Sequence, residues 1–83
     1  MRFDVALHEL RLVKSRSQAA AAIERREALL NGEPSKPSRT VAPGDRITLV
    51  GALGARTVEV LELPRRSLSK EAAKALVRDV GTS

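Results

Sequence analysis

The chain contains no cysteine, tryptophan or tyrosine, and it has only one histidine. Without cysteine, neither a disulfide framework nor a thiolate metal site can form, and a single histidine among scattered carboxylates argues against zinc. No apolar run approaches the roughly 20 residues that a membrane-spanning helix needs, and the N-terminal segment lacks the apolar core of a signal peptide. We therefore predict a cytoplasmic protein with no metal, cofactor or membrane partner.

Aromatic side chains, and side chains arranged for catalysis, are also lacking or rare. Phe3 is the only aromatic residue, and its helical spacing assigns it to the core, so stacking of single-stranded bases on side chains is not expected. The lone His8 has no second acid or base placed to help it, and no glycine-rich nucleotide loop is present. These absences predict a protein that is not an enzyme.

What the chain does have is positive charge. Fifteen lysine and arginine residues stand against ten acidic ones in 83 residues, for a formal net charge of +5. This balance favours a polyanion or an anionic membrane surface as the partner. Because a chain this short buries only about 60% of its unfolded surface, a single folded domain with one core is expected.

Two helices are predicted near the N-terminus. Apolar residues at helical spacing predict the first helix from Asp4 to about Val13. Ser15 followed three residues later by Gln18 fits a capping box and predicts a second helix from Arg16 to about Arg25.

Short β-type runs separated by turn residues fill the middle of the chain. The pair Asn31-Gly32 suits a tight turn because both residues tolerate positive φ. Strands are expected at 28–30, 39–41 and 46–50, with a last strand whose alternation covers 58–63. The last two would pair across a hairpin loop at 51–54, which makes a small antiparallel sheet.

A final helix is predicted after Pro64. Ser69 fits its N-cap, Glu71 lies in its first turn, and an apolar stripe extends it to Val80, with residues 81–83 fraying. The predicted fold is therefore α+β, with two N-terminal helices packed on a small antiparallel sheet and a short C-terminal helix. We divide it into a main domain at 1–64 and a C-terminal helix and tail at 65–83.

Cations flank the start of the predicted second helix. Arg11, Lys14 and Arg16 surround a helix N-terminus whose free N–H groups and dipole favour an anion. The helix dipole disfavours a cation at the position of Arg16 by about 0.3 kcal/mol or more. A bound phosphate would offset that cost. The alternative interpretation is three solvated cations between two helices.

A second basic cluster lies on a proline-stiffened turn, Lys36-Pro37-Ser38-Arg39. Stiffness lowers the entropy lost when such a turn docks on a phosphate backbone, although an ordinary polar connection has the same composition. Two clusters that a compact fold can bring together favour nucleic acid over either cluster taken alone. The pairs Arg25-Arg26 and Arg65-Arg66 have acidic neighbours in sequence and favour solvated faces.

Several ordered motifs between Met1 and about Leu49 resemble the S4 RNA-binding domain, and more narrowly the short stand-alone members of that family. The resemblance rests on Met-Arg-Phe-Asp at the start, Arg-Leu-Val-Lys-Ser-Arg-Ser-Gln-Ala-Ala from Arg11, Leu-Asn-Gly from Leu30, Lys-Pro-Ser-Arg-Thr-Val from Lys36 and Pro-Gly-Asp from Pro43. It implies an S4-like, or alpha-L, fold, with an S4 RNA-binding domain at 1–64. Chain length and the short C-terminal segment favour the ribosome-quality-control group of stand-alone S4 proteins over the heat-shock group.

In S4 domains, two packed helices and the turn after the Asn-Gly strand form one basic surface against structured RNA. By this resemblance the RNA-binding residues are Arg2, Arg11, Lys14, Arg16, Ser17, Gln18, Lys36, Ser38 and Arg39. The implied partner is ribosomal RNA of the large subunit, with tRNA as a further contact while a stalled nascent chain is processed. A monomer is expected.

One departure from the family concerns the link between the second helix and the first strand. S4 relatives often carry glycine there, whereas this chain has Arg25-Arg26. A left-handed turn at this position is strained by about 1 kcal/mol without glycine, unless the turn is built differently.

Two other function classes stay open on the sequence. The chain could be the RNA-docking fragment or partner of an RNA-modifying enzyme. It could also be a nucleic-acid-binding regulator that uses its first helices on duplex DNA, or its last helix on a protein.

Overall fold

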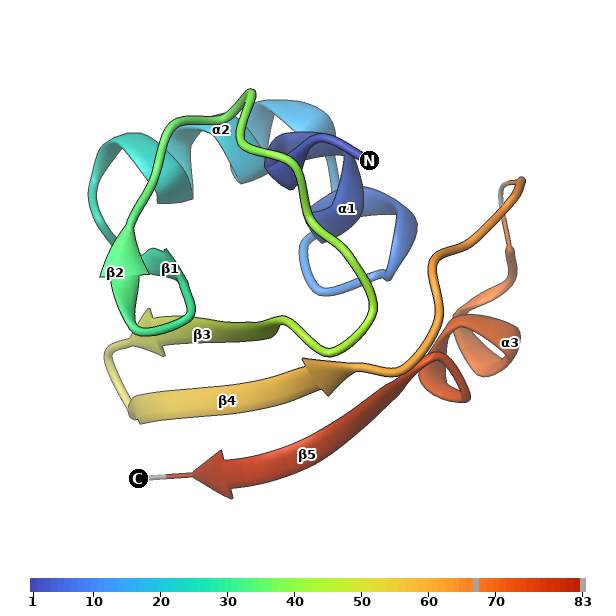
Figure 1. Cartoon of the computed structure of the whole chain (residues 1–83). Helices are drawn as coiled ribbons and strands as arrows, with labels where there is room; N and C mark the ends of the chain where they lie inside the picture. Colours follow the sequence, from blue (N-terminus) through green and yellow to red (C-terminus); the bar gives the residue numbers. More distant parts are fainter. Residues whose placement is uncertain (67, 83) are drawn as a thin grey trace.

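The computed structural model describes residues 1–66 and 68–82. Its elements, in chain order, are α1 (Phe3–Glu9), α2 (Arg16–Glu24), β1 (Ala28–Leu30), β2 (Glu33–Pro34), β3 (Arg46–Gly51), β4 (Gly54–Val60), α3 (Lys70–Lys74) and β5 (Val77–Thr82). All strand pairs are antiparallel, in the order β2-β1-β3-β4-β5. Helices α1 and α2 cover one face of this sheet (Figure 1). The predicted α+β class is confirmed.

The hydrophobic core lies between the two N-terminal helices and the sheet. Phe3 and Leu7 on α1 are completely buried, as predicted from their helical spacing. Ile47 on β3 and Val58 and Val60 on β4 meet them from the sheet side, each no more than 1% exposed. This burial orients α1, and therefore also the polar residues on either end of it.

Helix α1 is shorter than the sequence predicted. It ends at Glu9, because Arg11 adopts a left-handed conformation with φ 59°. The N–H of Leu12 donates to the carbonyl of Leu7 and the N–H of Arg11 to that of His8, the Schellman pattern of helix termination. The predicted extension to Val13 was wrong, since the apolar pattern continues through the turn after the helix has ended.

Helix α2 matches its prediction closely. The Ser15 hydroxyl accepts the Gln18 N–H at 3.1 Å, and the Gln18 side chain reaches back to accept the Lys14 N–H at 3.1 Å. At the other end Arg26 has φ 61°, and the Glu27 N–H donates to the carbonyl of Ala22. Of the two alternatives that the sequence left open here, the structure has the left-handed turn, with arginine where glycine is favoured.

The strands agree with the sequence in the centre of the sheet and differ at its edge. Strands β1 and β3 and the hairpin between β3 and β4 are confirmed. The predicted strand at 39–41 was wrong: Thr40 forms only an isolated bridge with Arg2, and the edge strand is β2, which folds back on β1 around Asn31-Gly32. Strand β4 covers 54–60, earlier than the alternation at 58–63 had placed it.

The C-terminal segment is the main correction. Ser69 does cap a helix by accepting the Ala72 N–H, but α3 ends at Lys74 and β5 follows it. The prediction of a helix to Val80 and of fraying at 81–82 was therefore wrong, while Ser83 lies outside the described residues. Strand β5 pairs with the outer edge of β4 and satisfies backbone groups that would otherwise lack partners. This tertiary pairing overrides a local sequence pattern that also fits a helix.

We expect Arg26→Gly to raise the free energy of unfolding by about 1 kcal/mol, because glycine adopts φ near 60° without the steric cost borne by arginine. The neighbouring Arg25→Gly removes the same charge at a right-handed position with φ −80°. It should lower the free energy of unfolding by about 0.5–1 kcal/mol. Urea denaturation of both variants checks the prediction, and a loss of stability in Arg26→Gly would contradict it.

Candidate nucleic-acid interface

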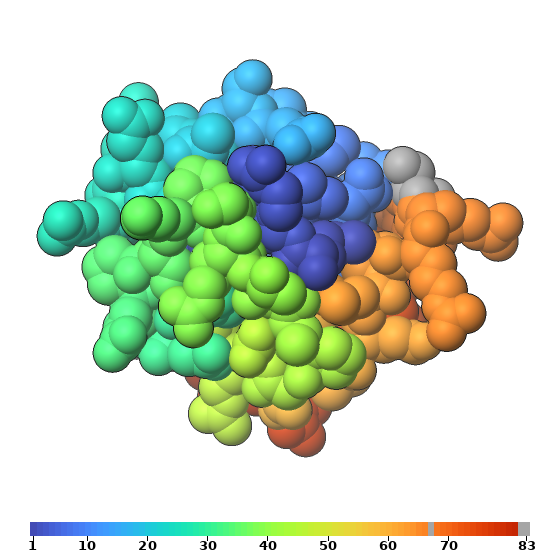
Figure 2. All heavy atoms as spheres, turned by 45° about the horizontal axis from the view of Figure 1, so that its top comes forward, coloured from blue at the N-terminus to red at the C-terminus, as the bar shows by residue number. Residues whose placement is uncertain are grey.

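The start of the chain pairs with the turn that the sequence singled out. The Phe3 N–H donates to the Arg39 carbonyl at 2.8 Å and the Asp4 N–H to the Pro37 carbonyl at 3.2 Å. The Val41 N–H donates to the Met1 carbonyl at 2.7 Å. These bonds hold residues 36–39 beside the first turn of α1. Figure 2 shows the dark-blue N-terminal residues against this green segment, with the light-blue start of α2 next to them.

A nearly buried carboxylate joins the two helices at this place. Asp4 accepts hydrogen bonds from Nε and Nη2 of Arg2, both at 3.1 Å, and its Oδ2 lies 3.8 Å from Nη2 of Arg16. The Asp4 side chain is 11% exposed, whereas those of Arg2 and Arg16 are 55% and 60% exposed. Asp4 therefore orients the Arg2 guanidinium by two hydrogen bonds and attracts that of Arg16, while both half-exposed side chains keep N–H donors for solvent or a ligand.

The turn at 36–39 adds exposed polar groups to the same region. The Arg39 N–H donates to the Lys36 carbonyl at 3.0 Å and closes the turn. Lys36, Ser38 and Arg39 are exposed and line a shallow hollow of about 370 Å³. We call Arg2, Arg16, Lys36, Ser38 and Arg39 the N-terminal basic surface.

The other four predicted site residues lie elsewhere or have structural contacts. Ser17 is exposed in the first turn of α2, next to Arg16 in the chain, and Gln18 is engaged in the cap. Arg11 turns toward the C-terminal segment, where its Nε and Nη2 donate to the Leu68 carbonyl. Lys14 lines a hollow with Arg11 and Lys70. The nine residues thus do not form one surface: five belong to the N-terminal basic surface, Arg11 and Lys14 line another hollow, and Ser17 and Gln18 lie in the first turn of α2. RNA contact by each of the nine stays a prediction.

Asp4 is the site residue that sequence reasoning missed. It was assigned only to the start of the helix, because an acid seldom points to a phosphate site. The spacing Arg2-x-Asp4, with the acid in the first turn of a helix, was the available signal. The partner Arg16 lies on another helix, so only the tertiary structure reveals that pair.

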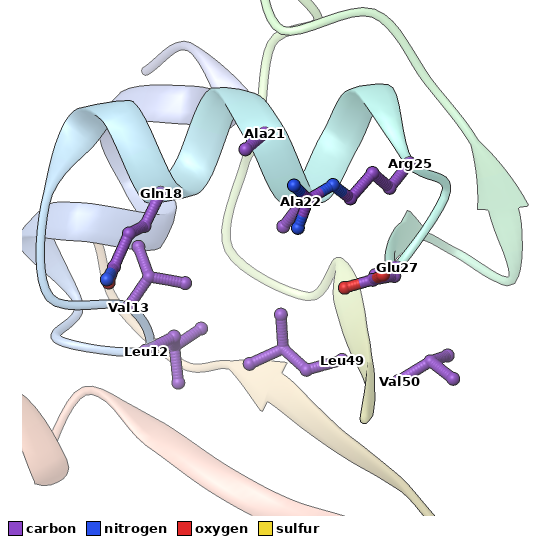
Figure 3. Close-up of a pocket in the computed structure, with 9 residues that line it drawn as sticks. All are labelled: Leu12, Val13, Gln18, Ala21, Ala22, Arg25, Glu27, Leu49 and Val50. Carbon is purple, nitrogen blue, oxygen red and sulfur yellow. The ribbon is translucent and has the colours of Figure 1, made fainter. Parts of the chain in front are cut away.

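Another hollow, of about 370 Å³, lies between α2 and β3 (Figure 3). Leu12, Val13 and Leu49 line it together with polar side chains, and Arg25 and Glu27 at one end have opposite charges. It therefore lacks the excess of positive charge that distinguishes the N-terminal basic surface. Within the described ranges 1–66 and 68–82, no cluster of three or more acidic or histidine side chains could hold a metal ion, and no helix could cross a membrane.

Two helix starts and a turn that present arginines over a small α+β scaffold define a class of domain built to bind a polyanion. Comparison with known proteins identifies it: the chain belongs to the S4 domain family, whose model matches residues 1–47. The matched region runs from α1 into β3, so it contains the whole N-terminal basic surface. S4 domains are RNA-binding domains, in agreement with the resemblance stated from the motifs.

Two relatives extend the likeness beyond residue 47. The chain is 36% identical over 73 residues to the RQC P-site tRNA stabilizing factor of Bacillus subtilis. The aligned region covers 88% of this chain and 85% of the relative. The trimeric structure of Vibrio cholerae heat shock protein 15 has the same fold, with a TM-score of 0.89 at 29% identity, over 96% of this chain and 81% of that one. The likeness to short stand-alone S4 proteins is confirmed.

We expect Asp4→Asn to lower the free energy of unfolding by about 1 kcal/mol, which is less than is usual for hydrogen bonds to charged groups because both arginines are half exposed. The control Glu24→Gln removes an exposed acid of α2 and should change stability by less than about 0.5 kcal/mol. Thermal and urea unfolding measure both variants. Equal stabilities for the two would contradict a structural role for the Asp4 pairs.

Proposed function

We propose that this protein is a non-catalytic RNA-binding protein of the cytoplasm that docks on structured ribosomal RNA of the large subunit. Its role would be in ribosome-associated quality control, on subunits that carry a nascent chain on tRNA. The observation that carries the proposal is the pair of guanidinium groups held by Asp4 beside the 36–39 turn. The printed name of the Bacillus subtilis relative, a P-site tRNA stabilizing factor, supports tRNA as a second contact.

The chemistry of the N-terminal basic surface fits a phosphate backbone. Arginine presents several N–H donors in a rigid fork that matches phosphate oxygens, and such charge-assisted bonds are stronger than neutral ones. In this proposal Arg16 and Arg39 bridge phosphates, while the hydroxyls of Ser17 and Ser38 add directional hydrogen bonds. Because aromatic stacking groups are lacking, recognition would act through the shape and backbone of folded RNA.

The binding unit we propose is a monomer. The five residues of the N-terminal basic surface gather within a single copy of the chain, where Asp4 pairs with Arg2 and Arg16. Heat shock protein 15 of Vibrio cholerae, in contrast, was solved as a trimer.

Replacing Arg16 and Arg39 by alanine together should flatten the salt dependence of RNA binding. Each arginine that neutralises one phosphate contributes close to one unit to the slope of log affinity against log salt, so the double variant should lose about two units. The control Arg25→Ala, Arg26→Gly removes the same two charges at the far end of α2 and should leave the slope nearly unchanged. A wild-type slope in the double variant would contradict the assignment.

Sedimentation with ribosomes tests the partner directly. The tagged protein should migrate with the large subunit at low and moderate salt, and Arg16→Ala should shift part of it to the top of the gradient. Duplex DNA and free tRNA, measured at the same salt, should bind more weakly than the subunit. If the wild type stays at the top at both salt concentrations, the ribosomal proposal fails and free RNA or DNA becomes the partner to examine.

A further inference from the structure

A second set of cations gathers where the loop between α1 and α2 meets α3. Two neighbouring hollows, of about 520 and 80 Å³, share Arg11, Leu12 and Lys70 among their lining residues. Neither shares a residue with the hollow of the 36–39 turn. We call this place the C-terminal basic cleft and define it by its five cations, Arg11, Lys14, Arg56, Lys70 and Lys74.

Two of the five charges are already compensated. Nε of Arg56 lies 2.7 Å from Oδ1 of Asp79, and this hydrogen bond holds the pKa of the Asp79 carboxyl below its ordinary value. Asp79 is therefore ionised at neutral pH and balances Arg56. Nζ of Lys74 lies 3.7 Å from Glu71. Arg56 and Lys74 thus add little net charge to the cleft.

The remaining three cations have no acidic partner among the residues that the structure describes. Arg11 donates to the Leu68 carbonyl, which is a neutral acceptor, at 3.0 and 2.7 Å. Within the described part of the chain, neither Lys14 nor Lys70 forms an ion pair. Like charges held around one hollow repel each other, and an anion bound between them would relieve that repulsion.

The cleft also has a defined shape. Arg11 leaves α1 in a left-handed conformation, and its two hydrogen bonds to Leu68 fasten the loop to the segment before α3. Leu12 and Val13 form an apolar wall between the cations. Arg11 and Lys14 belong to the region that the S4 model matches, whereas Lys70 lies beyond it, so the cleft exists only where the C-terminal segment packs against the S4 part.

We propose that the C-terminal basic cleft binds a second segment of RNA phosphate backbone, so that the protein holds two RNA segments at once. This inference rests on the proposed function. Three unbalanced cations around an open hollow match a string of phosphates better than an isolated acidic side chain. The whole molecule measures only 27 × 24 × 21 Å, so one folded RNA or two adjoining ones can reach both surfaces.

Salt-dependent binding to purified large ribosomal subunits tests the proposal with three double variants. Lys14→Ala, Lys70→Ala alters the cleft, and Arg16→Ala, Arg39→Ala alters the N-terminal basic surface. Arg25→Ala, Arg26→Gly is the control of equal charge. All the replaced side chains are exposed, and circular dichroism melting checks that each variant is folded.

The cleft variant should lose about two units of salt slope, and combining it with the surface variant should lose about four. A control-like slope in the cleft variant, with a reduced slope in the surface variant, overturns the cleft while the proposed function stands. A wild type that fails to bind subunits overturns the proposed function itself. Poly-glutamate that binds the wild type, but not the cleft variant, together with an unchanged RNA slope, would assign the cleft to an acidic protein partner instead.

Discussion

The architecture depends on the backbone pairing between residues 1–4 and 37–41. Met1 and Val41 are 40 positions apart in the chain and exchange hydrogen bonds. Closing so long a loop costs about 3 kcal/mol of chain entropy, because the cost grows with the logarithm of loop length. Burial of Phe3 and Val41, both almost fully removed from water, offsets it. The same pairing brings the turn with Lys36 and Arg39 to the helix that carries Asp4.

Charge organisation follows from that pairing. A surface meant for phosphate must gather arginines that repel each other, and a carboxylate beneath them reduces the cost. Asp4 does this with its side chain nearly buried, so its negative charge faces the guanidinium groups more than the solvent. The arginines keep their outward donors. The C-terminal basic cleft uses a different device: it ties Arg11 to a neutral carbonyl, which orients the guanidinium without neutralising it.

Both N-terminal helices end in the same strained manner. Each closes with a Schellman pattern whose left-handed residue is an arginine, Arg11 after α1 and Arg26 after α2. A residue other than glycine in this conformation costs on the order of 1 kcal/mol, and strained residues often cluster near sites of function. At Arg11 the strained backbone directs the side chain into the proposed cleft. At Arg26 no described contact accounts for the cost, and the arginine is exposed.

Local sequence signals were enough to predict the α+β class, the capped second helix, the Asn-Gly turn and the central hairpin, because each depends on neighbours within a few positions. It also singled out Arg16 and the 36–39 turn through charge and proline, and its motifs placed the chain in the S4 family. The hydrogen bonds of Asp4 with Arg2, its ion pair with Arg16, the bonds of Arg11 to Leu68 and the strand at 77–82 instead of a helix became visible in the tertiary structure alone. Each of these outcomes depends on a partner far away in the chain, and local periodicity has no information about such partners.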